Sequence, residues 1–271
     1  MRIIGYCICG KEADRYLEET LKCFQRLCDE TIIVLNNVTD KEREMIARYG
    51  FHIKEDNREW GKHQHQIKQD LMEDVEKLNP DWCIALDADE VLDPDFTRET
   101  IAEFSSLTAL YVYIVNLWDK GWNRKWSFWN IRAWKWTGDK KFSNRPLHCG
   151  LAPESAYYYG SYIPYYLKHY GLMKKEDRQK KIERYQKYDP QAVYKDVSYY
   201  NALANGVAIP LDYKFIKEAI KKEVGSPKLR KLNNLPKEDF VMVINPAGKI
   251  VDIPQSQLAE TLSREGFKLC K

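Results

Sequence analysis

The chain lacks several features that would point to a specialised environment. No apolar run approaches the about eighteen residues that a membrane-spanning helix needs, and residues 1–7 are apolar over too short a stretch for a signal peptide. The seven cysteines are odd in number and irregular in spacing, which suits a reducing compartment better than a disulfide framework. These absences predict a cytoplasmic protein without an integral membrane segment.

An excess of one charge sign is also lacking. Lys and Arg number 43 against 40 Asp and Glu, so the formal charge of +3 does not by itself imply a nucleic-acid partner. With 44% apolar and 31% charged residues, the composition is that of a globular protein and excludes a wholly disordered chain. At 271 residues the chain can fold without a disulfide or a structural metal, as one domain or two.

Short apolar runs and amphipathic stretches alternate along the first 115 residues. The runs predict buried strands at residues 2–9, 31–35, 51–53, 82–86 and 110–115. Apolar spacings of three and four predict helices over residues 13–28, 40–49 and 67–78. This alternation predicts an α/β fold with a mostly parallel, Rossmann-like sheet flanked by helices, and such sheets bind ligands beyond the carboxyl ends of their strands.

The alternation stops after residue 115. Residues 116–173 are rich in Trp and Tyr, and we expect them to complete the main domain, residues 1–173. Helical spacing with proline breakers then predicts a helical extension over residues 174–235. Two short apolar runs around an Asn-Pro-Ala-Gly turn, followed by a helix around residues 258–262, predict a small α+β unit over residues 236–271.

Acidic residues follow the strand predicted at residues 82–86 without a gap. Carboxylates beside a buried strand are costly unless a cation compensates them. Asp87 and Asp89 lie two residues apart where the strand ends, so both can reach one hard divalent ion whose other ligands are water and phosphate oxygens. A loop of solvated acids or a helix cap is the alternative for an isolated Asp-x-Asp.

The order of motifs over residues 2–190 resembles that of the family 2 glycosyltransferases with the GT-A fold. Residues 32–40 (IIVLNNVTD) are similar to the family's second strand and nucleoside loop, and residues 82–92 (WCIALDADEVL) resemble its metal-site strand. The resemblance implies a nucleotide-sugar donor, with a UDP-sugar expected, and Mn or Mg as the metal. Asp87 is then expected at the ribose or the metal and Asp89 at the metal, with the following glutamate bracing the loop.

A later segment adds a third expected ligand. Residues 168–171 (KHYG), followed by a Lys-rich stretch and Tyr188-Asp189-Pro190, resemble the part of the family in which a histidine often binds the metal. The resemblance therefore implies His169 as a ligand. A hydrogen-bonded structural histidine is the alternative for a lone residue of this type.

The chain also departs from the family pattern. Asn36 and Asn37 stand where the family commonly has Asp near the base, and they can hydrogen-bond uracil or ribose without bringing charge. The Arg-Asn pair that precedes the metal strand is matched only loosely, and we take Lys62 and Gln64 as the donor-side candidates there. The base preference of the donor site stays open.

An inverting transfer needs a carboxylate or a histidine to take the proton of the acceptor. His148 lies where related enzymes carry His-Glu, but here a cysteine stands in place of the acid. Glu154 is the nearest substitute and our first candidate for the base, and Asp139 is a weaker option. A solvated loop carboxylate is the alternative for Glu154.

Cations and indoles alternate densely over residues 122–136. Sugar faces and nucleobases both stack on aromatic rings, so the acceptor can be a glycan, a lipid-linked sugar or a nucleic acid. An amphipathic strand pair with Trp in the core accounts for part of the same pattern.

Two other functions compete with sugar transfer. A nucleotidyltransferase would need a glycine-rich basic loop after the first strand, and residues 9–12 (CGKE) are too poor in glycine. A non-catalytic module that binds a glycan or nucleic acid predicts metal-independent binding that survives the loss of Asp87 and Asp89.

Overall fold

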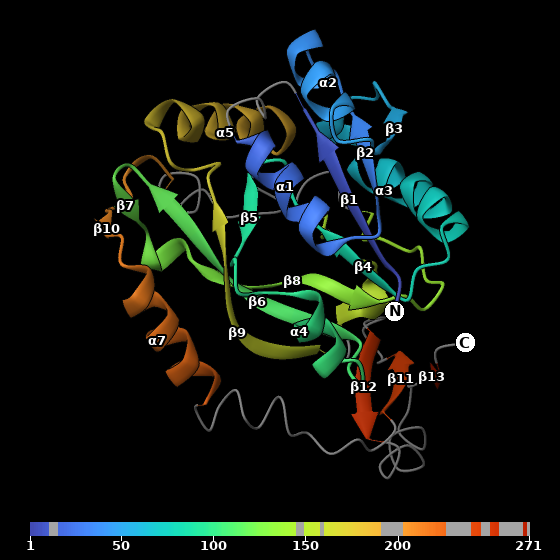
Figure 1. Cartoon of the computed structure of the whole chain (residues 1–271). Coiled ribbons are helices and arrows are strands. Elements are labelled where there is room, and N and C mark those ends of the chain that lie inside the picture. Colours follow the sequence, from blue (N-terminus) through green and yellow to red (C-terminus); the bar gives the residue numbers. More distant parts are fainter. Residues whose placement is uncertain are drawn as a thin grey trace. The chain divides into compact units, whose positions relative to one another are not determined.

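The structure, a computed structural model, describes residues 1–10, 16–144, 149–157, 160–190 and 203–225, together with three short strands of the C-terminal part. The chain divides into two compact units, Met1–Val224 and Gly225–Lys271. The first holds most of the elements (Figure 1). No helix in the described ranges is long and apolar enough to cross a membrane.

The first unit is built on one large mixed sheet. Its strands are β1 (Ile3–Cys9), β2 (Glu30–Leu35), β3 (His52–Glu55), β4 (Trp82–Ala85), β5 (Glu90–Leu92), β6 (Ala109–Trp118), β7 (Gly121–Trp122), β8 (Phe128–Lys135), β9 (Gly160–His169) and β10 (Ile209–Pro210). The order is β10-β7-β6-β8-β4-β1-β2-β3, and β9 pairs with both β5 and β6. The helices are α1 (Leu17–Leu27), α2 (Asp40–Ala47), α3 (Trp60–Lys77), α4 (Arg98–Glu103), α5 (Lys175–Tyr188) and α7 (Tyr213–Val224). The described residues of this unit also form two 3-10 turns, η1 (Arg124–Trp126) and η2 (Glu154–Tyr157).

The predicted α/β class is confirmed. Strands β3, β2, β1 and β4 run parallel to one another. The apolar stripe of α1, with Leu21 and Phe24, packs on one face of this half, and that of α3, with Leu71 and Val75, packs on the other. Helices cover both faces because strands buried on both sides expose apolar side chains in both directions.

The other half of the sheet is where the alternation of the sequence had stopped. Strand β8 runs antiparallel to both β4 and β6, and β9 runs parallel to β6 and antiparallel to β5. The β6–β8 and β6–β9 pairings each contain a register irregularity. This arrangement brings the end of β9 against the beginning of β5, directly after the turn that follows β4.

The later helices are those of the predicted extension. Helices α5 and α7 lie within residues 174–235 and within the first compact unit. The second unit contains an antiparallel sheet in the order β12-β11-β13, with β11 (Phe240–Ile244), β12 (Ile250–Pro254) and β13 (Lys268–Leu269). These strands agree with the predicted apolar runs, and the helix expected at residues 258–262 lies outside the described residues.

Candidate active site at the carboxyl edge of the sheet

A tight turn carries the acidic motif. Strand β4 ends at Ala85, and the backbone N–H of Glu90 donates to the carbonyl of Asp87 at 3.0 Å, which closes the turn before β5 begins. The Thr20 hydroxyl of α1 lies 2.9 Å from the Glu90 carbonyl oxygen and 3.2 Å from that of Ala88. The turn is therefore held by a neighbouring helix as well as by the strands.

A buried ion pair braces the same turn. The Arg132 guanidinium of β8 donates to both carboxylate oxygens of Glu90, with Nε 2.7 Å from Oε2. That Oε2 also accepts the backbone N–H of Asp87 at 3.0 Å. The side chains of Glu90 and Arg132 are 2% and 5% exposed. Burial raises the pKa of Glu90 to about 7, although the Arg132 guanidinium acts to lower it. Bracing is the role expected for this glutamate.

The structure brings His169 to the turn. It ends β9 and pairs with Glu90 across the strands, and its Nε2 lies 3.7 Å from Oδ2 of Asp89. The other ring nitrogen, Nδ1, hydrogen-bonds Oδ1 of Asn116. Because the amide oxygen only accepts, the proton lies on Nδ1 and the Nε2 lone pair faces Asp89. Asn116 was missed at the sequence level.

The electrostatics of this pair favour a cation between its members. Burial lowers the pKa of His169 to about 3, with a further lowering from Lys181, so the ring is neutral. Burial, with help from Asp87, raises the pKa of Asp89 to about 6. A carboxylate oxygen and an imidazole lone pair repel each other at close range unless a proton or a metal ion lies between them.

The spacing fits a divalent ion. Two ligands that each lie about 2.1 Å from one ion are roughly 3 to 3.7 Å apart at ordinary coordination angles. Asp89 and His169 meet this condition. Within the described residues, no group of three His, Cys, Asp or Glu side chains has metal-binding geometry. The remaining positions of an ion would fall to water, to phosphate oxygens or to Asp87, which acts electrostatically on both Asp89 and His169.

Gly171 keeps the gap open. A Cβ atom at this position would lie 2.3 Å from Oδ2 of Asp89 and 2.8 Å from Nε2 of His169. We therefore expect Gly171→Ala to push the two side chains apart and to weaken Mn²⁺ binding by about 10- to 100-fold, the range for disturbing the supports of a metal site.

The matched control for Gly171→Ala is Gly10→Ala, where the nearest atom to a new Cβ is the Asn36 carbonyl oxygen at 3.9 Å. The measurement is Mn²⁺ affinity of both variants by calorimetry, with thermal unfolding to verify the fold. Wild-type Mn²⁺ affinity in Gly171→Ala would contradict Asp89 and His169 as the ligand pair.

The expected nucleoside residues take different positions. Asn36 is buried, and its amide nitrogen donates to the carbonyls of Asp56 and Arg58 at 2.6 and 2.9 Å. Its amide N–H groups therefore hold the loop after β3. Asn37 is exposed, with φ of 57°. At the start of α3, Lys62 is exposed and ion-paired with Glu59 at 2.7 Å.

Gln64, the other donor-side candidate, is buried on α3 at 7% exposure. The structure thus leaves Asn37 and Lys62 at the surface and places Asn36 and Gln64 inside. Their contacts with a nucleotide stay a prediction.

The candidates for the catalytic base lie elsewhere. His148 falls outside the described residues. Glu154 opens η2 and forms an ion pair with Lys141 at 3.1 Å. Both carboxylate oxygens of Asp139 accept backbone N–H groups, those of Lys141 and Ser155, at 2.9 and 3.0 Å. Asp139 is thus engaged in holding its loop.

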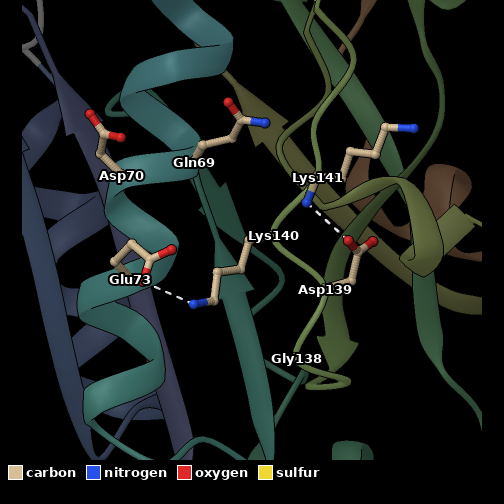
Figure 2. Close-up of a pocket in the computed structure, with 7 residues that line it drawn as sticks. All are labelled: Gln69, Asp70, Glu73, Gly138, Asp139, Lys140 and Lys141. Atoms are coloured by element: carbon tan, nitrogen blue, oxygen red, sulfur yellow. Dashed lines mark hydrogen bonds and ion pairs between the residues drawn. The ribbon is translucent and has the colours of Figure 1, made fainter.

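A polar groove of about 450 Å³ lies beside these loop residues. Figure 2 shows the loop, Gly138 to Lys141, across from Gln69, Asp70 and Glu73 of α3. Lys140 crosses it to Glu73 at 2.9 Å. The residues of the acidic turn do not line this groove. Among the described residues, no contact joins Glu154 or Asp139 to Asp89 or His169.

The loop that follows His148 in the chain is fixed to the site's surroundings. The buried ammonium of Lys68 on α3 donates to the carbonyls of Cys149 and Gly150 at 2.8 and 2.9 Å. The Tyr6 hydroxyl donates to the Leu151 carbonyl. Asp87 acts electrostatically on both Lys68 and Tyr6, so this loop begins near the acidic turn.

The aromatic segment divides between core and surface. Trp122 and Trp134 are buried at 3% and 2% exposure, which agrees with a core role. Phe128 is 48% exposed, and Trp126, Trp129 and Trp136 are half-buried. This second group has ring surface that a ligand can reach.

No protein-family model matches the chain, and no curated protein matches it. Among solved structures, the chain is similar to S. aureus TarS, with 11% identity and a TM-score of 0.44, over 75% of this chain and 42% of that one. TarS 1–349 in complex with UDP matches with 10% identity and a TM-score of 0.41, over 86% of this chain and 74% of that one. Glucosyl-3-phosphoglycerate synthase from Mycobacterium tuberculosis, in complex with Mn²⁺, UDP and phosphoglyceric acid, has 12% identity and a TM-score of 0.30, over 42% of this chain and 43% of that one.

The chain thus spans less than half of the first TarS structure. At these identities and TM-scores, the likeness does not extend to activity.

Proposed function

We propose that this chain is a metal-dependent inverting glycosyltransferase that moves a hexose-type sugar from a nucleotide-diphosphate donor, a UDP-sugar, to an acceptor hydroxyl. The observation that carries the proposal is the facing pair of Asp89 Oδ2 and His169 Nε2, 3.7 Å apart at the carboxyl edge of the parallel strands. Ligands bind at this edge in open α/β sheets. The sequence resemblance to family 2 glycosyltransferases supports the same assignment.

Asp89 and His169 would hold Mn or Mg, with Asp87 beside them. When bound, the ion stabilises the negative charge of the departing nucleoside diphosphate. Asn116 fixes the ring of His169 so that Nε2 faces the ion, and Glu90 with Arg132 fixes the turn that carries both aspartates. The chain's own residues thus hold a preformed site, which spares the cost of reorganising it during transfer.

The acceptor side is less defined. The acceptor is a glycan, a lipid-linked sugar or a nucleic acid, and the half-exposed rings of Trp126, Phe128 and Trp129 are its proposed contacts. Glu154 and His148 are the proposed bases, of which one takes the hydroxyl proton as the oxygen attacks the anomeric carbon.

A donor screen tests the proposal. Calorimetry with Mn²⁺ and UDP-, GDP- and dTDP-sugars should give binding of at least one donor that is lost when EDTA replaces the metal. Absence of binding across the panel would reject a transferase. Metal-independent binding of a glycan or nucleic acid that persists in Asp87→Ala and Asp89→Ala would instead establish the binding-module alternative.

A further inference from the structure

Helix α5 presents a cationic face to the metal-site turn. Residues 181, 184, 185 and 188 follow a spacing of three and four, so they share one side of the helix. Tyr185 is buried in a cluster with Trp118 and Leu172, and Asp87 acts electrostatically on its hydroxyl. This side of α5 is therefore directed toward the turn. In Figure 1, α5 lies at the edge toward which β1 and β9 run.

The two cations on this face differ from the other lysines of the helix. Lys181 and Arg184 are half-buried, whereas Lys175, Lys180 and Lys187 are exposed. Lys181 acts electrostatically on both Asp89 and His169, and Arg184 acts on Asp89. The ammonium of Lys181 nevertheless makes no hydrogen bond or ion pair within the part of the chain that the structure describes. A partly exposed ammonium that makes no such contact can bind an anionic ligand.

The helix that carries these cations is fixed at both ends. The Arg178 guanidinium donates to the carbonyls of Leu172 and Met173 at 2.9 and 3.0 Å, and it lies 4.4 Å from the ring centre of Trp118. At the other end, the Tyr188 hydroxyl donates to Glu59 at 2.5 Å. The position of the cationic face is thus set by contacts that do not involve a ligand.

The charges around the turn indicate which anion the two cations of α5 would bind. Asp87 and Asp89 bring two negative charges, and a divalent ion would balance them. Glu90 is already balanced by Arg132. A nucleoside diphosphate adds negative charge at the same edge, which only further cations offset, and charge-assisted contacts from Lys or Arg are the usual partners of phosphate oxygens.

We infer that Lys181 and Arg184 bind the diphosphate of the donor and of the product, and that they stabilise the leaving group opposite the metal ligands. This inference rests on the proposed function. In the transfer, the acceptor oxygen forms a bond to the anomeric carbon while the bond from that carbon to the phosphate oxygen breaks. The electron pair of the broken bond stays on the diphosphate, and the acceptor proton goes to the base. Lys181 and Arg184 stabilise the negative charge that the diphosphate gains.

The test is a comparison of nucleotide and nucleoside affinity. Calorimetry with Mn²⁺ measures Kd for UDP, GDP and dTDP, each beside its own nucleoside, in wild type, Lys181→Gln, Arg184→Gln and the control Lys175→Gln. We expect each of the first two substitutions to raise Kd for the bound diphosphate about 10-fold, the effect of losing one charge-assisted contact. Nucleoside affinity and the thermal midpoint should not change, Lys181→Arg should restore most of the loss, and Lys175→Gln should match wild type.

The outcomes separate this inference from the function on which it rests. If wild type binds no nucleoside diphosphate with Mn²⁺, the proposed function fails. If wild type binds one and neither Lys181→Gln nor Arg184→Gln weakens that binding, the proposed function stands and the inference is overturned. Equal weakening of nucleotide and nucleoside also overturns it, since that result reports a displaced helix and no phosphate contact.

Discussion

Replacement of Asp89 by asparagine is expected to lower kcat/KM for sugar transfer by about 10³-fold, the upper range for removing one electrostatic element from a preorganised site. Asparagine keeps the shape of the side chain and the turn but loses the charge that faces Nε2 of His169 at 3.7 Å. Its amide group holds a divalent ion more weakly than a carboxylate does. The loss should therefore appear in metal affinity as well as in turnover.

Two measurements check this expectation. Release of nucleoside diphosphate gives kcat/KM, and Mn²⁺ titration followed by electron paramagnetic resonance gives the metal affinity. Glu44→Gln, which removes an exposed carboxylate on α2, serves as the control with the same change of charge. Turnover of Asp89→Asn within about threefold of the control would rule out Asp89 as a metal ligand, because a lost ligand costs far more than that.

Removal of Arg132 should have the largest effect on stability. Arg132→Met leaves the carboxylate of Glu90 buried at 2% exposure without its partner. Breaking a buried pair in this way costs about 3 to 5 kcal/mol in the free energy of unfolding. For a unit of this size, that corresponds to a fall in Tm of roughly 10 °C.

The double variant Glu90→Gln with Arg132→Met is the informative comparison. It removes both charges, so it should recover a large part of the stability that Arg132→Met loses. Urea unfolding of wild type, both single variants and the double variant gives the coupling free energy. A double variant as unstable as the sum of the single variants would show that the pair is not coupled.

The parallel half of the fold was predictable because its signals are local. Strands β1, β2 and β4 are apolar runs, and Asp87 follows the last of them by chain order alone. The carboxyl edge of such a sheet is a consequence of strand direction, so the place of the acidic turn follows from the alternation of strands and helices.

The partners of that turn were harder to predict because they come from distant strands. Asn116 and Arg132 each interrupt an apolar run, and a polar residue in a buried strand signals a buried partner without identifying it. The partners are set by β5 against β9 and by β8 between β4 and β6. All three pairings are antiparallel, and the β6–β8 pairing contains a register irregularity. His169 was expected through family resemblance, and its hydrogen bond to Asn116 was not.

The pairing of β5 with β9 has a consequence for folding. Asp89 and His169 lie far apart in the chain and meet only once these two strands are in register. Long-range pairings of this kind form late, because their loop-closure entropy is high. A partly folded chain therefore already carries the acidic turn, but it acquires the histidine only on completing the sheet. Tight metal binding would then mark the fully assembled chain, and a divalent ion would favour the native state over its folding intermediates.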